Sequence, residues 1–242
     1  MNVLVACEFS GIVRDAFEDA GWNAWSCDLL PTESEQTKAA NKHLQGDILR
    51  IIKGKWYGCK NIDDVMTLEL QQIIEEKEWD LLIGHPPCTY LSYAYTGKER
   101  YSIERLQNKI NAYQFFLDLW DAPIEHICLE NPMGYIHSGL LPCSQIIEPY
   151  YFGDPYKKKT CLWLKNLPPL QYSKEDTMFE KKTAVKPEYH LVDGGNKVLL
   201  PRKYSGGKGK QKKLKSKFHK GIAAAMAEQW TEYLLLTKKA IK

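Results

Sequence analysis

Residues 2–28, NVLVACEFSGIVRDAFEDAGWNAWSCD, decide the fold class of this chain. Residues 2–8 are apolar and partly β-branched, which predicts a strand. Residues 12–20 repeat apolar side chains at helical spacing, and Gly21 ends that helix. Residues 23–28 return to a strand pattern. A strand, a helix and a second strand in this order predict the first crossover of a mainly parallel sheet.

The rest of the chain continues the alternation of strands and helices. Strands are predicted at residues 80–84, 126–130 and 160–164, and helices at 64–77, 103–120 and 222–236. One face of the helix at 103–120 is expected to be apolar, and it carries Leu106, Ile110, Tyr113, Leu117 and Trp120. The predicted fold class is therefore α/β, with a mainly parallel, Rossmann-like sheet covered by helices on both faces. Ligands of such a sheet bind at the carboxyl ends of its strands.

Length and composition agree with one globular domain, or one domain with a small insertion. The chain has 242 residues, of which 44% are hydrophobic and 26% charged, so disorder along the whole chain is excluded. No apolar run approaches the roughly 20 residues of a membrane-spanning helix, and the N-terminus lacks the pattern of a secretory signal. The seven cysteines form no CxxC pair and no zinc-type spacing, so no metal is expected. A reducing cytoplasm is the expected location.

The positive charge is concentrated in one late segment. Residues 195–220 contain ten Lys or Arg and no acidic residue, while the whole chain has a net charge of only +3. This basic segment is expected to bind phosphates, and the alternative is a solvated loop that only maintains solubility.

The predicted strands end in groups suited to binding a nucleotide-like cofactor. Phe9-Ser10-Gly11 follows the first strand and permits a tight turn close to a ligand. Asp28 follows the second strand and can bond a ribose hydroxyl. Gly46-Asp47-Ile48 supplies a further loop acid that could lie near an adenine ring. Both acids are also common as turn or helix caps, so that alternative stays open.

Residues 84–90, GHPPCTY, follow a buried strand and contain the strongest candidate nucleophile. Two prolines stiffen the loop and present Cys88, which favours a nucleophilic thiol over a small side chain packed under a loop. Cys7, Cys128 and Cys161 lie within strand patterns and are expected to pack in the core.

Glu130 ends the predicted strand at 126–130 and is followed by Asn131-Pro132. Poor solvation there would raise the pKa of the Glu130 carboxyl group and suit a proton donor. The alternative is a glutamate that turns to solvent at the strand end.

Taken in order, these segments resemble the DNA cytosine carbon-5 methyltransferase family, most closely its compact phage and prophage members. Pro87-Cys88 resembles the catalytic motif and Glu130-Asn131 the family's Glu-Asn motif, while Lys157 and Lys159 lie where the family usually has arginines. The resemblance covers roughly residues 1–164 and 218–236. It implies a catalytic core at 1–164, a short basic insertion at 165–217 in place of a target-recognition domain, and a C-terminal helix at 218–242 that returns to the core.

The resemblance also implies an activity: transfer of a methyl group from S-adenosylmethionine to carbon 5 of cytosine through a covalent cysteine adduct. Cys88 would be the nucleophile and Glu130 the general acid. The catalytic residues implied are Cys88, Glu130, Pro87, Lys157 and Lys159. The cofactor-binding residues implied are Phe9, Ser10, Gly11, Asp28, Leu29, Asp47 and Ile48. The DNA-binding residues expected in the basic segment are Lys208, Lys210, Lys212, Lys213, Lys215 and Lys217.

DNA is the expected partner, with neither a membrane nor a metal, and the protein is expected to be a monomer or weak dimer in a bacterial cytoplasm. A role in restriction–modification is one setting that the resemblance suggests.

Three other functions stay open. An amino-methyltransferase for exocyclic nitrogens uses an Asp/Asn-Pro-Pro-aromatic motif, whereas His85 and Cys88 occupy its outer positions here. A related enzyme could act on a free pyrimidine nucleotide or transfer a modified alkyl group. The third of these alternatives is a non-catalytic nucleic-acid-binding protein.

Overall fold

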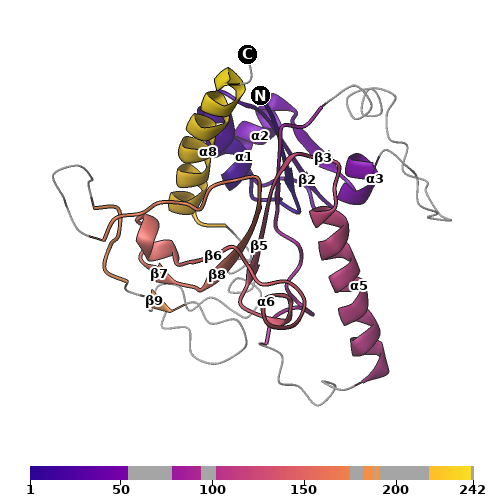
Figure 1. Ribbon diagram of the computed structural model, residues 1–242. Helices are drawn as coiled ribbons and strands as arrows, with labels where there is room; N and C mark the ends of the chain where they lie inside the picture. Colours follow the sequence, from indigo (N-terminus) through magenta and orange to yellow (C-terminus); the bar gives the residue numbers. More distant parts are fainter. Residues whose placement is uncertain (54–77, 94–101, 175–181, 188, 191–217, 241–242) are drawn as a thin grey trace.

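The computed structural model describes residues 1–53, 78–93, 102–174, 182–187, 189–190 and 218–240. A seven-stranded sheet runs through its centre in the order β3-β2-β1-β4-β5-β8-β6 (Figure 1). Its strands are β1 (Asn2–Ala6), β2 (Asn23–Asp28), β3 (His43–Gln45), β4 (Leu81–Gly84), β5 (His126–Pro132), β6 (Gln145–Ile147) and β8 (Thr160–Lys165). A second, two-stranded sheet pairs β7 (Tyr156–Lys157) with β9 (Tyr189–His190).

Strand direction divides the large sheet into two parts. β1 pairs in parallel with β2 and β4, and the parallel part continues to β3 on one side and β5 on the other. β8 pairs antiparallel with both β5 and β6. The strand order reverses direction between β1 and β4, and an open sheet of this kind binds ligands at the carboxyl ends of the strands beside such a reversal.

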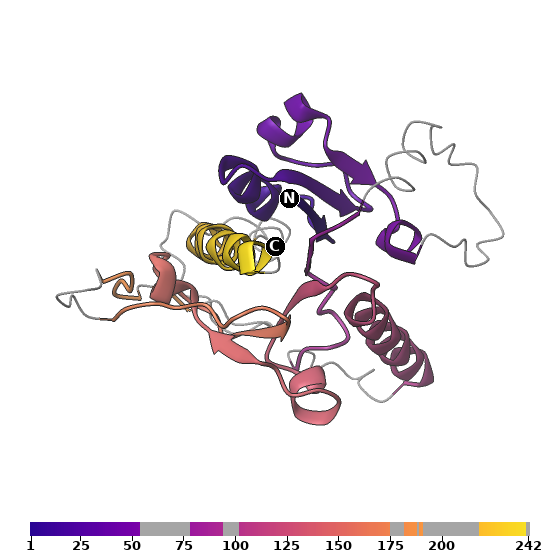
Figure 2. The ribbon, with the colours of Figure 1, turned by 45° about the horizontal axis from the view of Figure 1, so that its top comes forward.

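Helices cover both faces of the sheet. They are α1 (Ile12–Asp19), α2 (Glu35–Ala40), α3 (Ile48–Lys53), α5 (Ile103–Trp120), α6 (Tyr135–Gly139), the 3₁₀ turn η2 (Pro149–Phe152) and α8 (Lys220–Ala240). Figure 2 shows α8 beside α1, with α5 across the sheet from them. Phe17 of α1 and Trp230 of α8 belong to one buried core, whereas Ile48 of α3 and Phe116 of α5 belong to the other. The predicted Rossmann-like α/β fold is confirmed.

Two predicted strand ends are wrong, and both lie at the site. β1 stops at Ala6 because Cys7 takes a left-handed conformation with φ of 58°, so Cys7 belongs to the turn and not to the strand core. β5 continues beyond Glu130 to Pro132 because the antiparallel strand β8 pairs with it there. Cys128 and Cys161 are buried in the core as predicted. The predicted helix at 64–77 lies outside the described residues.

The helix α5 has the predicted bounds but a different buried face. Phe116 and Leu119 are its buried residues, whereas Leu106 and Ile110 are exposed by 58% and 50%. Only the second half of α5 packs on the sheet, since both buried positions lie there. Apolar spacing alone does not reveal where the covered part of a helix begins.

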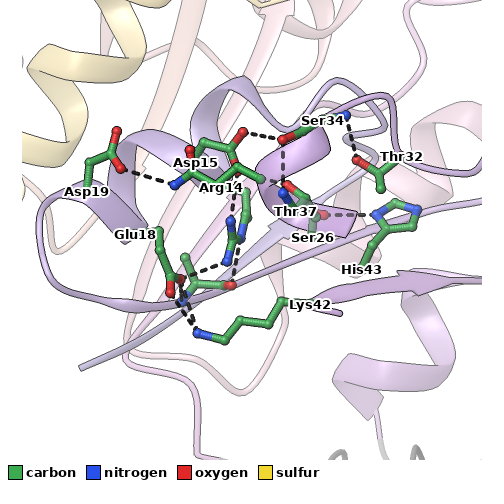
Figure 3. A network of polar contacts seen from close by, with 12 residues as sticks. Arg14, Asp15, Glu18, Asp19, Ser26, Thr32, Ser34, Thr37, Lys42 and His43 are labelled. Atoms are coloured by element: carbon green, nitrogen blue, oxygen red, sulfur yellow. Dashed lines mark hydrogen bonds and ion pairs between the residues drawn. The ribbon is translucent and has the colours of Figure 1, made fainter. Parts of the chain in front are cut away.

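A polar network holds α1 against β2 and α2 (Figure 3). The buried guanidinium of Arg14 donates from Nε to the Ala24 carbonyl at 3.0 Å and pairs with Glu18 at 2.9 Å. Asp15 accepts hydrogen bonds from the hydroxyls of Ser34 and Thr37 at the start of α2. These bonds fix the crossover that brings the ends of β1 and β2 together.

None of the helices in the described part of the chain combines the length and apolarity needed to cross a membrane. The six lysines expected to bind DNA, between Lys208 and Lys217, lie outside the described residues, as does most of the predicted insertion at 165–217. Before this gap, Leu167 and Leu170 are buried in the core that α8 completes.

Candidate active site

A cavity of about 480 Å³ opens at the carboxyl ends of β1, β2, β3 and β4. Its volume lies in the range of small-molecule and cofactor pockets. Five of the residues singled out by sequence line it: Asp28, Leu29, Asp47, Ile48 and Pro87. The structure therefore brings together segments that are far apart in the sequence.

The two aspartates serve as turn residues as well as cavity walls. Asp28 accepts a hydrogen bond from the Leu30 amide at 2.8 Å, and Asp47 accepts one from the Leu49 amide at 3.0 Å. The turn interpretation of these acids is confirmed, and cofactor binding by the two aspartates stays a prediction. Burial, with added effects of the two carboxylates, raises the pKa of the Cys7 thiol in the same cavity wall to about 12. Cys7 is therefore an unreactive thiol at neutral pH.

Several residues of the cavity wall carried no sequence signal. Tyr90 and Thr89 come from the loop after β4, and α5 contributes Asn108, Asn111, Ala112 and Phe115. The helix was predicted, but nothing in its spacing indicated which of its residues would face a ligand. Leu29 is 74% exposed at the cavity, although it is a large apolar residue.

The loop that carries Cys88 is tied to the segment that carries Glu130. The buried Asn131 amide donates to the Pro86 carbonyl at 2.7 Å. The Tyr135 amide donates to the Leu91 carbonyl at 2.8 Å, and Ser92 forms a β-bridge with Gly134. The Pro-Pro-Cys and Glu-Asn motifs are therefore neighbours, at the ends of adjacent strands.

Gly134 is required for this contact between the two segments. A Cβ atom there would lie 2.1 Å from the Leu91 carbonyl oxygen, so a side chain would separate the two backbones. Cys88 is half-buried in this loop, and its neighbours Pro87 and Thr89 line the large cavity.

Glu130 is a buried carboxylate surrounded by cationic and imidazole groups. Its Oε2 lies 3.4 Å from Nδ1 of His85. Burial raises the pKa of Glu130, but the His85 hydrogen bond and the charges of Lys158, His85 and His219 outweigh burial and hold the pKa below its usual value. The expectation of a raised pKa is wrong, because the sequence showed the burial but not the cations. Glu130 is consequently ionised at neutral pH and is not a resting proton donor.

A second, small cavity of about 40 Å³ lies beside Glu130. It is lined by Cys7, Glu8, Phe9, Ser10, His85, Glu130, Lys158 and Phe218. Phe9 and Ser10 are thus near the predicted acid rather than in the large cavity. Glu8, which the sequence did not single out, caps α1 by accepting from the amides of Val13 and Arg14 at 2.7 and 3.1 Å.

Gly11 lies outside both cavities and has a structural role. Its φ is 71°, and a Cβ atom there would lie 2.4 Å from Cβ of Ser34. The residue must therefore be glycine for α2 to pack against the start of α1.

Within the described residues, the lysine that lines the cavity beside Glu130 is Lys158, which lies between the two positions suggested by the family pattern. Lys158 lines the small cavity and lowers the pKa of Glu130. Lys157 belongs to β7, with its ammonium 5.9 Å from the centre of the Tyr150 ring, and Lys159 is exposed. Lys157 lies in the short strand β7, and the next residue, Lys158, reaches the small cavity. The spacing of lysines in the sequence could not predict which of them lines that cavity.

One group of side chains in the described residues could hold a metal ion, which the sequence spacing did not indicate. The ligand atoms of His137, Cys143 and Cys161 lie within 4.8 Å of one another. Nδ1 of His137 already accepts a hydrogen bond from the Cys143 amide at 3.1 Å. None of these residues lines either cavity described above.

No family model and no curated protein matches this sequence. Among solved structures, the chain is similar to the S. pombe Dnmt2 methyltransferase, with 16% identity and a TM-score of 0.43 over 70% of this chain and 52% of that one. It is also similar to the Entamoeba histolytica methyltransferase EhMeth, with 16% identity and a TM-score of 0.41 over 73% of this chain and 57% of that one. The chain thus spans just over half the length of these two structures.

Proposed function

We propose that this protein is an S-adenosylmethionine-dependent methyltransferase that acts on carbon 5 of cytosine in a nucleic acid. The observation that carries the proposal is the contact between the Cys88 loop and the Glu130 segment, made by the 2.7 Å bond from Asn131 to Pro86, beside a cofactor-sized cavity. Two segments that carry a thiol and a carboxylate and are tied together in this way suit addition to a polar heterocycle.

The large cavity has hydrogen-bond acceptors suited to the hydroxyl and amino groups of an adenosine. Asp28 could accept hydrogen bonds from the ribose hydroxyls and Asp47 from the adenine amino group. Ile48 and the exposed Leu29 offer apolar contact to the base. Bound S-adenosylmethionine would supply an electrophilic methyl group for carbon 5 of the target base.

The residues of this chain would prepare the base for that transfer. The Cys88 thiolate would add to carbon 6, which makes carbon 5 nucleophilic. The ionised Glu130 would accept a hydrogen bond from the amino group on carbon 4. Lys158, in the same small cavity, would offset the negative charge that develops on the ring nitrogen beside that carbon.

Cations and aromatic rings around the Cys88 loop support a nucleic acid as the substrate. The guanidinium of Arg105 lies 5.1 Å from the centre of the Tyr90 ring, and the Lys109 ammonium lies 3.2 Å from the centre of the Tyr135 ring. Tyr93, in the same loop region, is 47% exposed. Aromatic faces combined with positive charge are typical of surfaces that bind unpaired nucleotides.

Product analysis tests this proposal directly. The protein is incubated with methyl-labelled S-adenosylmethionine and with single-stranded DNA, duplex DNA, RNA or deoxycytidine monophosphate, and the products are hydrolysed and identified by mass spectrometry. We expect 5-methylcytosine from a polynucleotide, and none with Cys88→Ala. N4-methylcytosine or N6-methyladenine would instead identify an amino-methyltransferase. Product from the free nucleotide alone would reject a nucleic-acid substrate.

A further inference from the structure

His85 is a half-buried polar residue at the site, and the proposed reaction gives it no role. Its Nδ1 lies 3.4 Å from Oε2 of Glu130, and its side chain is 12% exposed. Its ring packs against Phe218 with the ring centres 4.7 Å apart. Its Nε2 is buried and has no hydrogen-bond partner among the described residues, yet His85 lines the small cavity beside Glu130.

The contact with Glu130 decides which nitrogen of the neutral His85 imidazole carries the hydrogen. A carboxylate only accepts hydrogen bonds, so Nδ1 must carry the hydrogen. A neutral imidazole with hydrogen on Nδ1 has its lone pair on Nε2. In this neutral form the unpartnered atom is a proton acceptor, held in place by a carboxylate on the other side of the ring. This is the arrangement by which a buried carboxylate orients a histidine general base.

We propose that His85 is the base that removes the hydrogen from carbon 5 of the methylated cytosine, with Glu130 orienting it. The inference rests on the proposed function. Glu130 would hold the amino group on carbon 4, and carbon 5 is the next atom of the ring. His85, which is hydrogen-bonded to Glu130, would therefore lie along the same edge of the base. Cys88 would act at carbon 6, and it is not among the residues that line the cavity containing His85.

The bond between carbon 5 and hydrogen breaks, and the proton goes to Nε2 of His85. The electron pair of that bond forms the double bond between carbons 5 and 6. The bond between carbon 6 and sulfur breaks, and its electron pair leaves with Cys88 as the thiolate. The imidazolium so formed is stabilised by the Glu130 carboxylate and later loses its proton to solvent.

The charged groups around His85 come from four elements of the fold. Glu8 follows β1, Glu130 lies in β5, and Lys158 lies between β7 and β8. His219, just before α8, adds a further imidazole near Glu130. Glu8 and Glu130 bring negative charge to the surroundings of this imidazole, and Lys158 brings positive charge.

The test uses His85→Gln, methyl-labelled S-adenosylmethionine and ordinary cytosine DNA, analysed on a denaturing gel. We expect a labelled protein–DNA complex to accumulate, because methyl transfer proceeds while release of Cys88 is slowed. Release of methylated DNA should fall by about 10²-fold or more. The wild-type protein should show free methylated DNA and little complex. His126→Gln, at the opposite end of β5, is the matched control and should behave like the wild type.

A second substrate separates this role from a structural one. DNA with 5-fluorocytosine has no hydrogen to remove at carbon 5, so His85→Gln should form the covalent complex on it as the wild type does. With ordinary DNA, added imidazole should restore product release to His85→Ala.

Two results would overturn the role of His85. One is wild-type release of product by His85→Gln, and the other is failure of that variant to form the complex on 5-fluorocytosine DNA, which would place His85 in thiol activation or loop positioning. Failure of the wild type to form any complex would reject the proposed function itself, and with it this inference.

Discussion

At the residue scale, His219 makes the stability of the protein depend on pH. Burial, together with the Lys158 charge, lowers the pKa of His219 to about 4. The unfolded chain therefore binds a proton on this residue at higher pH than the folded protein does. The free energy of unfolding should be highest above the unfolded pKa of about 6.5 and fall as the pH drops from there towards 4.

His219→Gln should remove this part of the pH dependence. The wild type should lose up to about 3 kcal/mol from this residue between pH 7 and pH 4, and the variant should not. Urea unfolding at a series of pH values measures the difference. Phe218→Leu changes the packing next to His219 without removing an ionisable group, so it should keep the wild-type slope. Equal slopes in the wild type and His219→Gln would contradict the assignment.

Asn131 is the residue that positions the nucleophile loop. Asn131→Ala removes the buried bond to the Pro86 carbonyl, which should lower stability by about 1–3 kcal/mol and slow methyl transfer. Chemical denaturation and single-turnover methyl transfer measure the two effects. Gln114→Ala, on the exposed side of α5, is the control and should change neither. A variant with lowered stability but unchanged transfer would show that the bond supports the fold only.

At the scale of elements, the connection of α1 to β2 depends on Arg14. Arg14→Met should lower the free energy of unfolding by about 1–3 kcal/mol, because the buried Ala24 carbonyl loses its hydrogen-bond donor while Glu18 keeps Lys42 as a partner. Lys38→Met breaks the exposed pair with Glu35 and should cost less than about 1 kcal/mol. Urea unfolding of both variants gives the comparison. Similar losses for the two would mean that the Arg14 network does not hold the crossover.

The sequence predicted the bounds of helices and strands better than the contacts that these elements make with distant segments. The bounds of β2 and α5 followed from local patterns, since alternation and helical spacing are local properties. The end of β5 did not follow, because Pro132 stays in the strand only through pairing with β8, which comes later in the chain. The buried face of α5 also depends on a partner that spacing does not reveal.

The same distinction holds within the site. Asp28, Pro87 and Glu130 could be named from the sequence because each follows or ends a predicted strand, and Asp47 could be named from its Gly-Asp-Ile motif. The ionised state of Glu130 could not, since it depends on His85 and Lys158 from distant segments.

At the scale of the whole molecule, the basic segment at 195–220 is expected to bind the nucleic-acid backbone. Replacing Lys208, Lys210, Lys212, Lys213, Lys215 and Lys217 by Gln should weaken binding to all sequences and flatten its salt dependence. The slope of log K against log salt should fall by about 0.9 for each lost phosphate contact on duplex DNA. Fluorescence anisotropy at several salt concentrations measures it. An unchanged slope would remove this segment from the interface.

The central claim is that Cys88 adds to carbon 6 of a cytosine while methyl transfer takes place. Wild-type protein, S-adenosylmethionine and DNA containing 5-fluorocytosine, resolved on a denaturing gel, test it most directly, because fluorine at carbon 5 prevents release of the enzyme. We predict a shifted protein–DNA band that depends on the cofactor and is absent with Cys88→Ala. Absence of the band in protein that still binds S-adenosylmethionine would contradict the account.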